Sequence, residues 1–301
     1  MDHNGYAWWY VDAVSEDHAH AITIIALLGS VFSPYYAGAR ARGPADPLNH
    51  CAMNVALYGP RADRWALTER GARSVARGDR DLAIGPSSME WDGTELRISF
   101  DETAAPIPTR LRGSVRVRPS FVAGDVFSLD AAGKHAWTPI APLATAEVHL
   151  ESPSLRFRGP AYFDSNAGDE PLEQAFSSWT WSRSSSPRET AVTYHVRRAD
   201  GTNALIGNVF GSGGQVRDLE GLCEMPLGRT RWGVDRNIQA DAAAKPHVLR
   251  TLEDTPFYAR SLASASFGGR PSAVVHEALS LDRFKQSWVR FLLPFRMRRE
   301  P

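Results

Sequence analysis

Two short stretches of the chain place an aromatic residue two positions from an ionisable one. Tyr162 and Asp164 lie in GPAYFDSNAGDEP, and His135 and Trp137 lie in KHAWTPIAP. Residues two apart in a strand point to the same face, so each pair presents its side chains together. A carboxyl group beside aromatic walls is desolvated, which raises its pKa and lets it act as an acid near neutrality. Asp164 is therefore a candidate general acid, and its alternative role is to cap the turn that follows. His135 and Trp137 equally suit the exposed end of a hairpin.

The stretch WWYVD near the N-terminus is a third candidate. Trp8, Tyr10 and Asp12 share one face if this stretch is a strand, where they would suit a ligand site or a hydrogen-bonded core carboxylate. His18 and His20 have the same spacing, but the sequence offers no third metal ligand at a recognisable distance. No metal site is therefore expected.

The composition excludes several classes of function. The 301 residues include 34 Lys+Arg and 34 Asp+Glu, so no net charge attracts nucleic acid. Cys51 and Cys223 form no CxxC motif, which favours a reducing compartment. The chain has no P-loop and no GxSxG motif. The start MDHNGYAWWYVD does not resemble a signal peptide, and the longest apolar run, ITIIALLGSVF, is shorter than the ~20 residues that span a bilayer. A cytoplasmic protein is expected.

Short β-type segments separated by turns dominate the chain. GSVRVRP alternates between apolar and charged residues, and Asp92-Gly93 and Asp200-Gly201 are hairpin signals. The segment VRFLLPF is also interpreted as a strand, whereas DEPLEQAFSSWTWSR, residues 169–183, is expected to hold one short helical turn. These patterns predict an all-β protein built from antiparallel barrels or sandwiches. The Ser-rich stretch SRSSSPRE is the best candidate for a linker, although a long loop within one domain has the same pattern. A boundary between residues 150 and 185 is expected, dividing the chain into domains 1–158 and 159–301.

Longer blocks of sequence resemble the carotenoid 1,2-hydratases, also called hydroxyneurosporene synthases. These blocks run from residue 5 to residue 299 and are GYAWWYVDA, TIIALLGSVFSPYYAGAR, NHCAMNVALYG, RWALTERG, GPAYFDSNAGDEPLE, RTLEDTPFYARS, VHEALSLDRF and LPFRMRR. The resemblance implies a cofactor-independent enzyme of phototrophic bacteria. Such an enzyme adds water across the terminal C1,C2 double bond of an acyclic carotenoid such as neurosporene or lycopene. The resemblance also implies two lipocalin-like antiparallel β-barrel domains, and it places the site at His135, Trp137, Tyr162 and Asp164.

The chemistry of hydration gives these four residues distinct expected roles. Because the reaction is redox-neutral, no nicotinamide or flavin is needed. Asp164 would protonate C2 and leave a tertiary cation at C1, which the face of Trp137 would stabilise by ~2 kcal/mol. Tyr162 would share that role or orient the Asp164 carboxyl. His135 would position the attacking water and accept its proton, unless Asp164 serves as both acid and base.

The expected partners are an acyclic carotenoid and water, with Trp8, Tyr10 and Asp12 at the substrate. Arginines beside apolar residues in LPFRMRR favour a peripheral contact with the inner, photosynthetic membrane, although a final strand with a charged tail has the same pattern. Two other functions stay open. One is a lipocalin-like carrier of an apolar ligand. The other is a cofactor-free isoprenoid cyclase, which begins with the same protonation but quenches the cation with an internal alkene.

Overall fold

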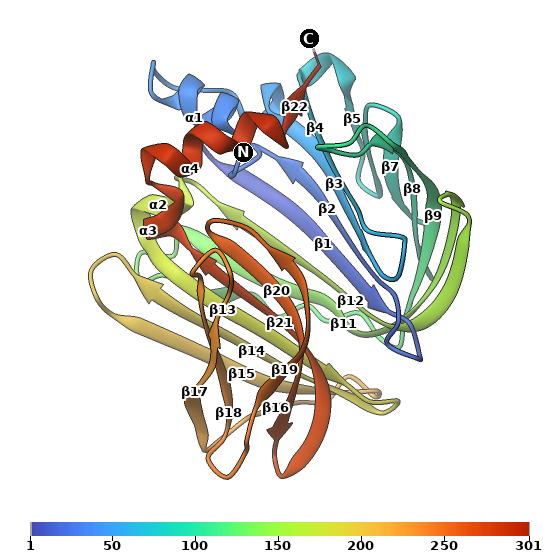
Figure 1. Ribbon diagram of the computed structural model, residues 1–301, viewed down its shortest axis with the longest axis vertical. Helices are drawn as coiled ribbons and strands as arrows, with labels where there is room; N and C mark the ends of the chain where they lie inside the picture. The colour runs from blue at the N-terminus through green and yellow to red at the C-terminus, as the bar shows by residue number, and fades with distance from the viewer. Residues whose placement is uncertain (1, 301) are drawn as a thin grey trace. The chain divides into compact units, whose positions relative to one another are not determined.

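The computed structural model describes residues 2–300, which form two compact, strand-rich units (Figure 1). Unit 1 comprises Met1–Pro171 together with Phe291–Pro301, and unit 2 comprises Leu172–Arg290. The protein is mostly β, as the alternating segments predict. The contacts divide the chain after Pro171, and the expected domain boundary at residue 158, with its interval of 150–185, stays a prediction.

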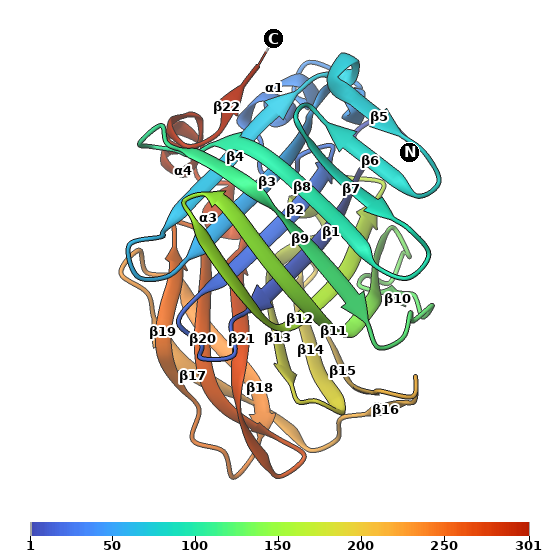
Figure 2. The same ribbon diagram turned by 90° about the vertical axis from the view of Figure 1, so that its right-hand side faces the viewer.

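One large sheet forms the body of unit 1. Its strands are β1 Tyr6–Val14, β2 Ala21–Leu28, β3 Cys51–Tyr58, β4 Arg64–Arg70, β5 Val75–Arg77, β6 Asp81–Ile84, β7 Ser87–Trp91, β8 Leu96–Thr103, β9 Arg110–Pro119, β10 Phe127–Ser128, β11 His135–Ser152, β12 Leu155–Gly168 and β22 Arg298–Arg299. Their order is β22-β4-β3-β2-β1-β12-β11-β9-β8-β7-β6-β5, with β10 paired to β11 (Figures 1 and 2). All neighbours are antiparallel except β22 and β4, which are parallel. The chain thus brings its N-terminal strand β1 directly against β12.

The two faces of the central strands carry different kinds of side chain. Val11 and Ala13 of β1 and Ala161 and Phe163 of β12 belong to the apolar core of unit 1. The same alternation buries one face of β8 and β9, where GSVRVRP turns its valines inward as predicted. Since side chains alternate along a strand, the even-numbered residues of β1 and β12 lie on the face opposite this core.

Unit 2 is built from a seven-stranded and a two-stranded antiparallel sheet. The larger sheet has the order β16-β15-β14-β13-β21-β20-β19, and the smaller sheet pairs β17 with β18. The bounds are β13 Phe176–Ser185, β14 Glu189–Arg198, β15 Asn203–Gly211, β16 Val216–Asp218, β17 Leu222–Arg229, β18 Asp235–Asp241, β19 His247–Asp254, β20 Tyr258–Phe267 and β21 Arg270–Ser280. The predicted helical turn is α2, Leu172–Ala175, and α3 is Leu281–Phe284.

Two sequence-based expectations about local structure are wrong. SRSSSPRE is no linker, because it forms the end of β13, the turn that follows and the first residue of β14 inside unit 2, as the alternative of a loop within one domain allowed. VRFLLPF is no strand, because it forms the end of helix α4, Ser287–Leu292, and the 3-10 helix η3, Leu293–Phe295. Val289 and Leu293 are buried while Phe291 is exposed. That spacing of four is helical, whereas a strand would place all three side chains on one face.

Helix α1, Pro34–Arg40, was not predicted either. Ser33 caps it, since its Oγ accepts hydrogen bonds from the backbone N–H groups of Tyr35 and Tyr36 at 3.1 Å. Proline at the first helical position completes a typical helix start. Another 3-10 helix, η1 Pro47–Asn49, and a third, η2 Ala72–Ser74, connect strands of the same unit. Within residues 2–300, no helix has the length and apolar character needed to cross a membrane.

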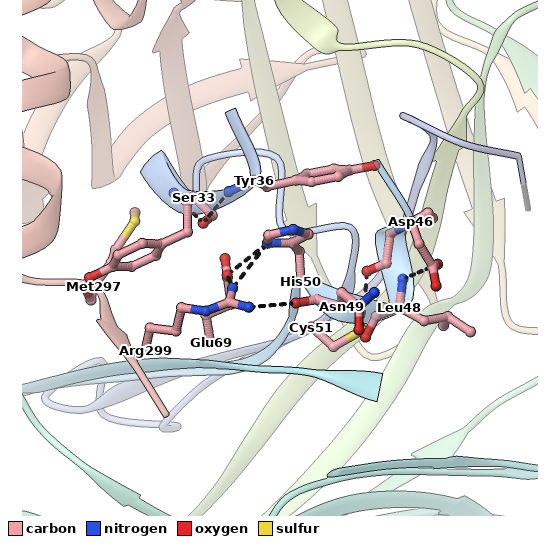
Figure 3. A network of polar contacts seen from close by, with 12 residues as sticks. Ser33, Tyr36, Asp46, Leu48, Asn49, His50, Cys51, Glu69, Met297 and Arg299 are labelled. Carbon is pink, nitrogen blue, oxygen red and sulfur yellow. Dashed lines mark hydrogen bonds and ion pairs between the residues drawn. The ribbon is translucent and has the colours of Figure 1, made fainter. Parts of the chain in front are cut away.

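An ionic cluster around the buried Glu69 holds β22 against the rest of unit 1 (Figure 3). Arg299 forms an ion pair with Glu69, a carboxylate with no solvent exposure, and also donates to the carbonyl of Asn49 at 3.3 Å. His50 lies 2.8 Å from the same carboxylate, and its ring stacks on that of Tyr36. Because a buried charge is costly without partners, this cluster fixes β22 beside β4.

Candidate active site

Three adjacent strands carry every residue that the sequence singled out for the site. Within unit 1, β12 lies between β1 and β11. Across β1 and β12, Tyr10 lies opposite Asp164 and Asp12 lies opposite Tyr162. Directly opposed residues share a face, so these four side chains project together from the side of the sheet away from the core. The pairings of the remaining positions are Trp8 with Asn166, Trp137 with Asn166, and His135 with Gly168.

Asp164 lies at the centre of this arrangement. Its carboxyl is buried, with 4% of the residue exposed. Trp137 donates from Nε1 to Asp164 Oδ2 at 2.8 Å, and Tyr162 donates from its hydroxyl to the same oxygen at 2.8 Å. Two fixed donors on one oxygen orient the carboxyl and stabilise negative charge on it. These contacts do not support the alternative role of Asp164 as a turn cap, because its side chain binds two buried aromatic residues.

The two aromatic partners of Asp164 are themselves fully buried. Tyr162 and Trp137 have no solvent exposure, and Trp137 packs on Phe127 with ring centroids 5.1 Å apart. Burial raises the pKa of Tyr162 well above its ordinary value, and the nearby Asp164 carboxylate adds to this shift. The Tyr162 hydroxyl therefore keeps its proton and remains a hydrogen-bond donor.

A second tyrosine–aspartate pair lies beside the first. Tyr10 donates from its hydroxyl to Asp12 Oδ2 at 3.2 Å, and Asp12 has no solvent exposure. The rings of Tyr10 and Tyr162 meet edge to face, with centroids 6.2 Å apart. Trp8 continues the same face along β1. The sequence grouped these three residues of β1 correctly on one face, next to Tyr162 and Asp164.

His135 lies at the other end of the arrangement. Its Nδ1 is 2.8 Å from the hydroxyl of Tyr6, whose ring stacks on the imidazole, and its Nε2 is 3.7 Å from Glu170 Oε1. Burial lowers the pKa of His135, and the neighbouring carboxylates of Asp130 and Glu170 oppose that shift. The imidazole is thus neutral at pH 7.

The register separates His135 from Asp164. His135 pairs with Gly168, four residues beyond Asp164 on β12. At ~3.3 Å per residue, the backbones of the two positions are about 13 Å apart along the strand. The structure therefore brings Trp137, Tyr162 and Asp164 into contact, and it places His135 with Tyr6 further along the same face.

Sequence reasoning missed two residues of this face, Tyr6 and Asn166. Both are buried, and both extend a pattern that was already visible, since Tyr6 precedes Trp8 by two positions and Asn166 follows Asp164 by two. Continuing the alternation in each direction would have found them.

The two histidines of the HxH motif do not share a strand face. His18 has a φ of 58° in the turn before β2, and His20 stacks on Phe157. Among residues 2–300, no group of three or more His, Cys, Asp or Glu side chains is arranged to hold a metal ion.

Comparison with a solved structure places the fold. The crystal structure of an AttH protein from Nitrosomonas europaea matches with a TM-score of 0.64. It is 13% identical and covers 91% of this chain and 92% of its own. At this identity the similarity concerns the fold alone.

Sequence comparison places the chain in a family. Residues 24–301 match the family model Carotenoid hydratase CrtC, and the chain belongs to this family. The relatives named acyclic carotenoid 1,2-hydratase include that of Thiocapsa roseopersicina, which is 50% identical over 296 residues, or 98% of this chain and 73% of the relative. The protein of that name from Rubrivivax gelatinosus is 46% identical over 300 residues, with the same coverage of both chains.

Proposed function

We propose that this chain is an acyclic carotenoid 1,2-hydratase, a hydro-lyase that adds water across the terminal C1,C2 double bond of a carotenoid such as lycopene or neurosporene. Family membership over nearly the whole chain and 50% identity to a relative of that name support this reaction. The observation that carries the chemistry is the buried Asp164 carboxyl, which receives hydrogen bonds from both Trp137 and Tyr162.

The first step is protonation of the alkene by Asp164. Burial disfavours a charged carboxylate before the reaction, so the group can hold a proton for transfer. Trp137 and Tyr162 both donate to Oδ2, and we assign the transferred proton to Oδ1. When the proton moves to C2, the negative charge that develops on Asp164 is met by two donors already in place.

The cation left at C1 needs electron-rich surfaces instead of hydrogen-bond donors. Trp137 and Tyr162 are held by their own hydrogen bonds to Asp164, so their rings lie next to the acid. A desolvated aromatic face contributes ~2 kcal/mol to stabilising a cation. Trp8 and Tyr10 extend the aromatic surface along β1, where the apolar substrate would lie.

Water then captures the cation and gives up a proton. His135 and the Asp164 carboxylate are the two acceptors that the sequence proposes. No redox cofactor enters this scheme, because addition of water to an alkene is redox-neutral overall. We also propose that the strand-rich units 1 and 2 are two lipocalin-like domains.

We also propose a peripheral contact with the membrane in which the substrate dissolves, for a protein located in the cytoplasm. Phe291 and Phe295 are 70% and 65% exposed, and their rings meet edge to face at 5.8 Å. Arg296 and Arg298 follow within three residues, so apolar and cationic groups lie together as at a lipid headgroup layer. Replacing both phenylalanines with serine should weaken sedimentation with anionic vesicles, while unchanged sedimentation would remove this contact from the proposal.

The test of the reaction is incubation of the purified protein with lycopene in heavy-oxygen water. A labelled tertiary alcohol is expected, and Asp164→Asn should abolish it while carotenoid binding persists. A product of unchanged mass would indicate a cyclase. Binding without any conversion by either protein would indicate a carrier, and both results would overturn the proposed function.

A further inference from the structure

A second buried carboxyl lies beside the proposed acid and has no role in the steps described so far. Asp12 is fully buried on β1, and Tyr10 donates to its Oδ2 at 3.2 Å. A carboxylate removed from water is costly to keep in a fold. Its position on the same face as Asp164, and not in the core of unit 1, suggests a function in the reaction.

The strand register fixes the relation between the two carboxyls. Tyr10 faces Asp164, and Asp12 faces Tyr162, so the two aspartates lie on one diagonal of a four-residue square and the two tyrosines on the other. Diagonal neighbours on antiparallel strands have side chains ~7–8 Å apart. Paired carboxyls that act on opposite sides of one water molecule in glycosidases are ~6.5–9.5 Å apart. In those glycosidases this spacing leaves room for one water molecule between the two groups.

A buried hydroxyl adjoins Asp12 on its other side. Thr23 lies opposite Asp12 on β2 and is 3% exposed. Its Oγ1 has no hydrogen-bond partner within residues 2–300. Because buried hydroxyls are nearly always satisfied, this group favours a bound polar molecule next to Asp12.

We propose that Asp12 is the general base of the hydration, accepting the proton of the water that attacks the C1 cation. This inference rests on the proposed function and completes its proton balance. Asp164 loses its proton to C2 and becomes a carboxylate. Water forms the C1–O bond and transfers one proton to the Asp12 carboxylate, which becomes a carboxylic acid. Transfer of that proton to Asp164 through a second water restores both groups.

The strand register places Asp12 nearer to the acid than His135. The backbone of His135 lies about 13 Å along the strand from that of Asp164, four register positions away. Asp12 is a diagonal neighbour of the acid.

An experiment with heavy water as the solvent separates protonation of the alkene from capture of the cation by water. Asp12→Asn keeps the shape and can still accept the Tyr10 hydrogen bond, so the fold should persist, as thermal unfolding would verify. Its hydration rate should fall by about 10²–10⁴-fold, the usual contribution of a general base. In Asp12→Asn, Asp164 still protonates C2 and forms the C1 cation. Without a base to activate water, the cation returns a proton to Asp164. Recovered carotenoid should therefore gain deuterium with Asp12→Asn and none with Asp164→Asn.

Two further variants sharpen the result. Tyr10→Phe leaves the Asp12 carboxyl in place and should give a smaller loss of hydration, with a smaller gain of deuterium in the substrate. Asp125→Asn, an exposed carboxyl of the same unit, is the matched control and should behave as the unaltered protein.

Either of two outcomes would overturn the role of Asp12. One is hydration by Asp12→Asn within about threefold of the unaltered protein, which is too small a loss for a general base. The other is loss of deuterium exchange together with hydration in a folded variant, which would place Asp12 before the cation. Failure of the unaltered protein to form any alcohol refutes the proposed function instead, so the two failures are distinguishable.

Discussion

Removing one hydroxyl from the site tests whether the donors to Asp164 stabilise charge during the reaction. Tyr162→Phe keeps the buried ring and deletes only the group that donates to Asp164 Oδ2 at 2.8 Å. The Trp137 donor, also at 2.8 Å, remains. The variant therefore lowers the number of these donors to Oδ2 from two to one without opening a large cavity.

The magnitude follows from the charge on the acceptor. A hydrogen bond to a charged group contributes about 1.5–3 kcal/mol, and this bond gains strength as Asp164 gives up its proton. Since ~1.4 kcal/mol corresponds to tenfold in rate, kcat should fall by about 10–150-fold. KM should change little, because a hydrocarbon substrate cannot hydrogen-bond to the missing hydroxyl.

The assay is the initial rate of alcohol formation from lycopene in detergent, measured by chromatography across substrate concentrations. Tyr36→Phe is the matched control, since it removes a buried hydroxyl that donates to the Gly5 carbonyl at 2.7 Å, away from the proposed site. It should lower stability but leave kcat unchanged. A Tyr162→Phe enzyme with kcat within about threefold of the unaltered protein would refute the reasoning, since an interaction made in the transition state would be worth more.

Three further predictions concern other parts of the molecule. Gly168→Ala would place a Cβ 2.5 Å from Tyr6 and 2.6 Å from His135 Nδ1, so both rings must shift. We expect urea unfolding to show about 1–3 kcal/mol of lost stability, together with reduced turnover. Unchanged turnover would exclude the Tyr6–His135 pair from the site. Burial lowers the pKa of His135 below 6.5, so its neutral form persists from pH 8 down to 6.5; a loss of kcat/KM with a midpoint above 6.5 that disappears in His135→Gln would contradict this. Burial lowers the pKa of His276 to about 4 in the folded protein. Because the unfolded chain binds the proton first, about 3 kcal/mol of stability should be lost as the pH falls from 6.5 to 4. In urea titrations His276→Gln should lose less stability over that range, and an equal loss would contradict the assignment.

The strands were largely predictable from sequence because their alternation is local. β9 buries every second residue as GSVRVRP indicates, and the Asp200-Gly201 signal does join β14 to β15. The helical C-terminal segment was missed because Val289, Phe291, Leu293 and Phe295 alternate as in a strand while their burial follows a spacing of four. Only tertiary packing decides between these two periods.

The candidate site was predictable as pairs of residues but not as an arrangement. The two-residue spacing correctly grouped Tyr162 with Asp164 and His135 with Trp137. It could not show that Asp12 faces Tyr162, because this depends on β1 pairing with a strand from the far end of unit 1. It also could not show the distance between His135 and Asp164, which depends on the register of β11 against β12.

The parallel strand β22 makes the order of synthesis matter for folding. Unit 1 gains this strand only from residues that follow all of unit 2. While the ribosome is still making unit 2, β4 is an uncovered edge, and the Glu69 carboxylate lacks Arg299. Exposed strand edges recruit other chains, so the unpaired Thr68–Glu69 edge should add to the risk of aggregation during this interval. We expect that chains ending before residue 298 aggregate during expression even though every residue proposed for catalysis is present.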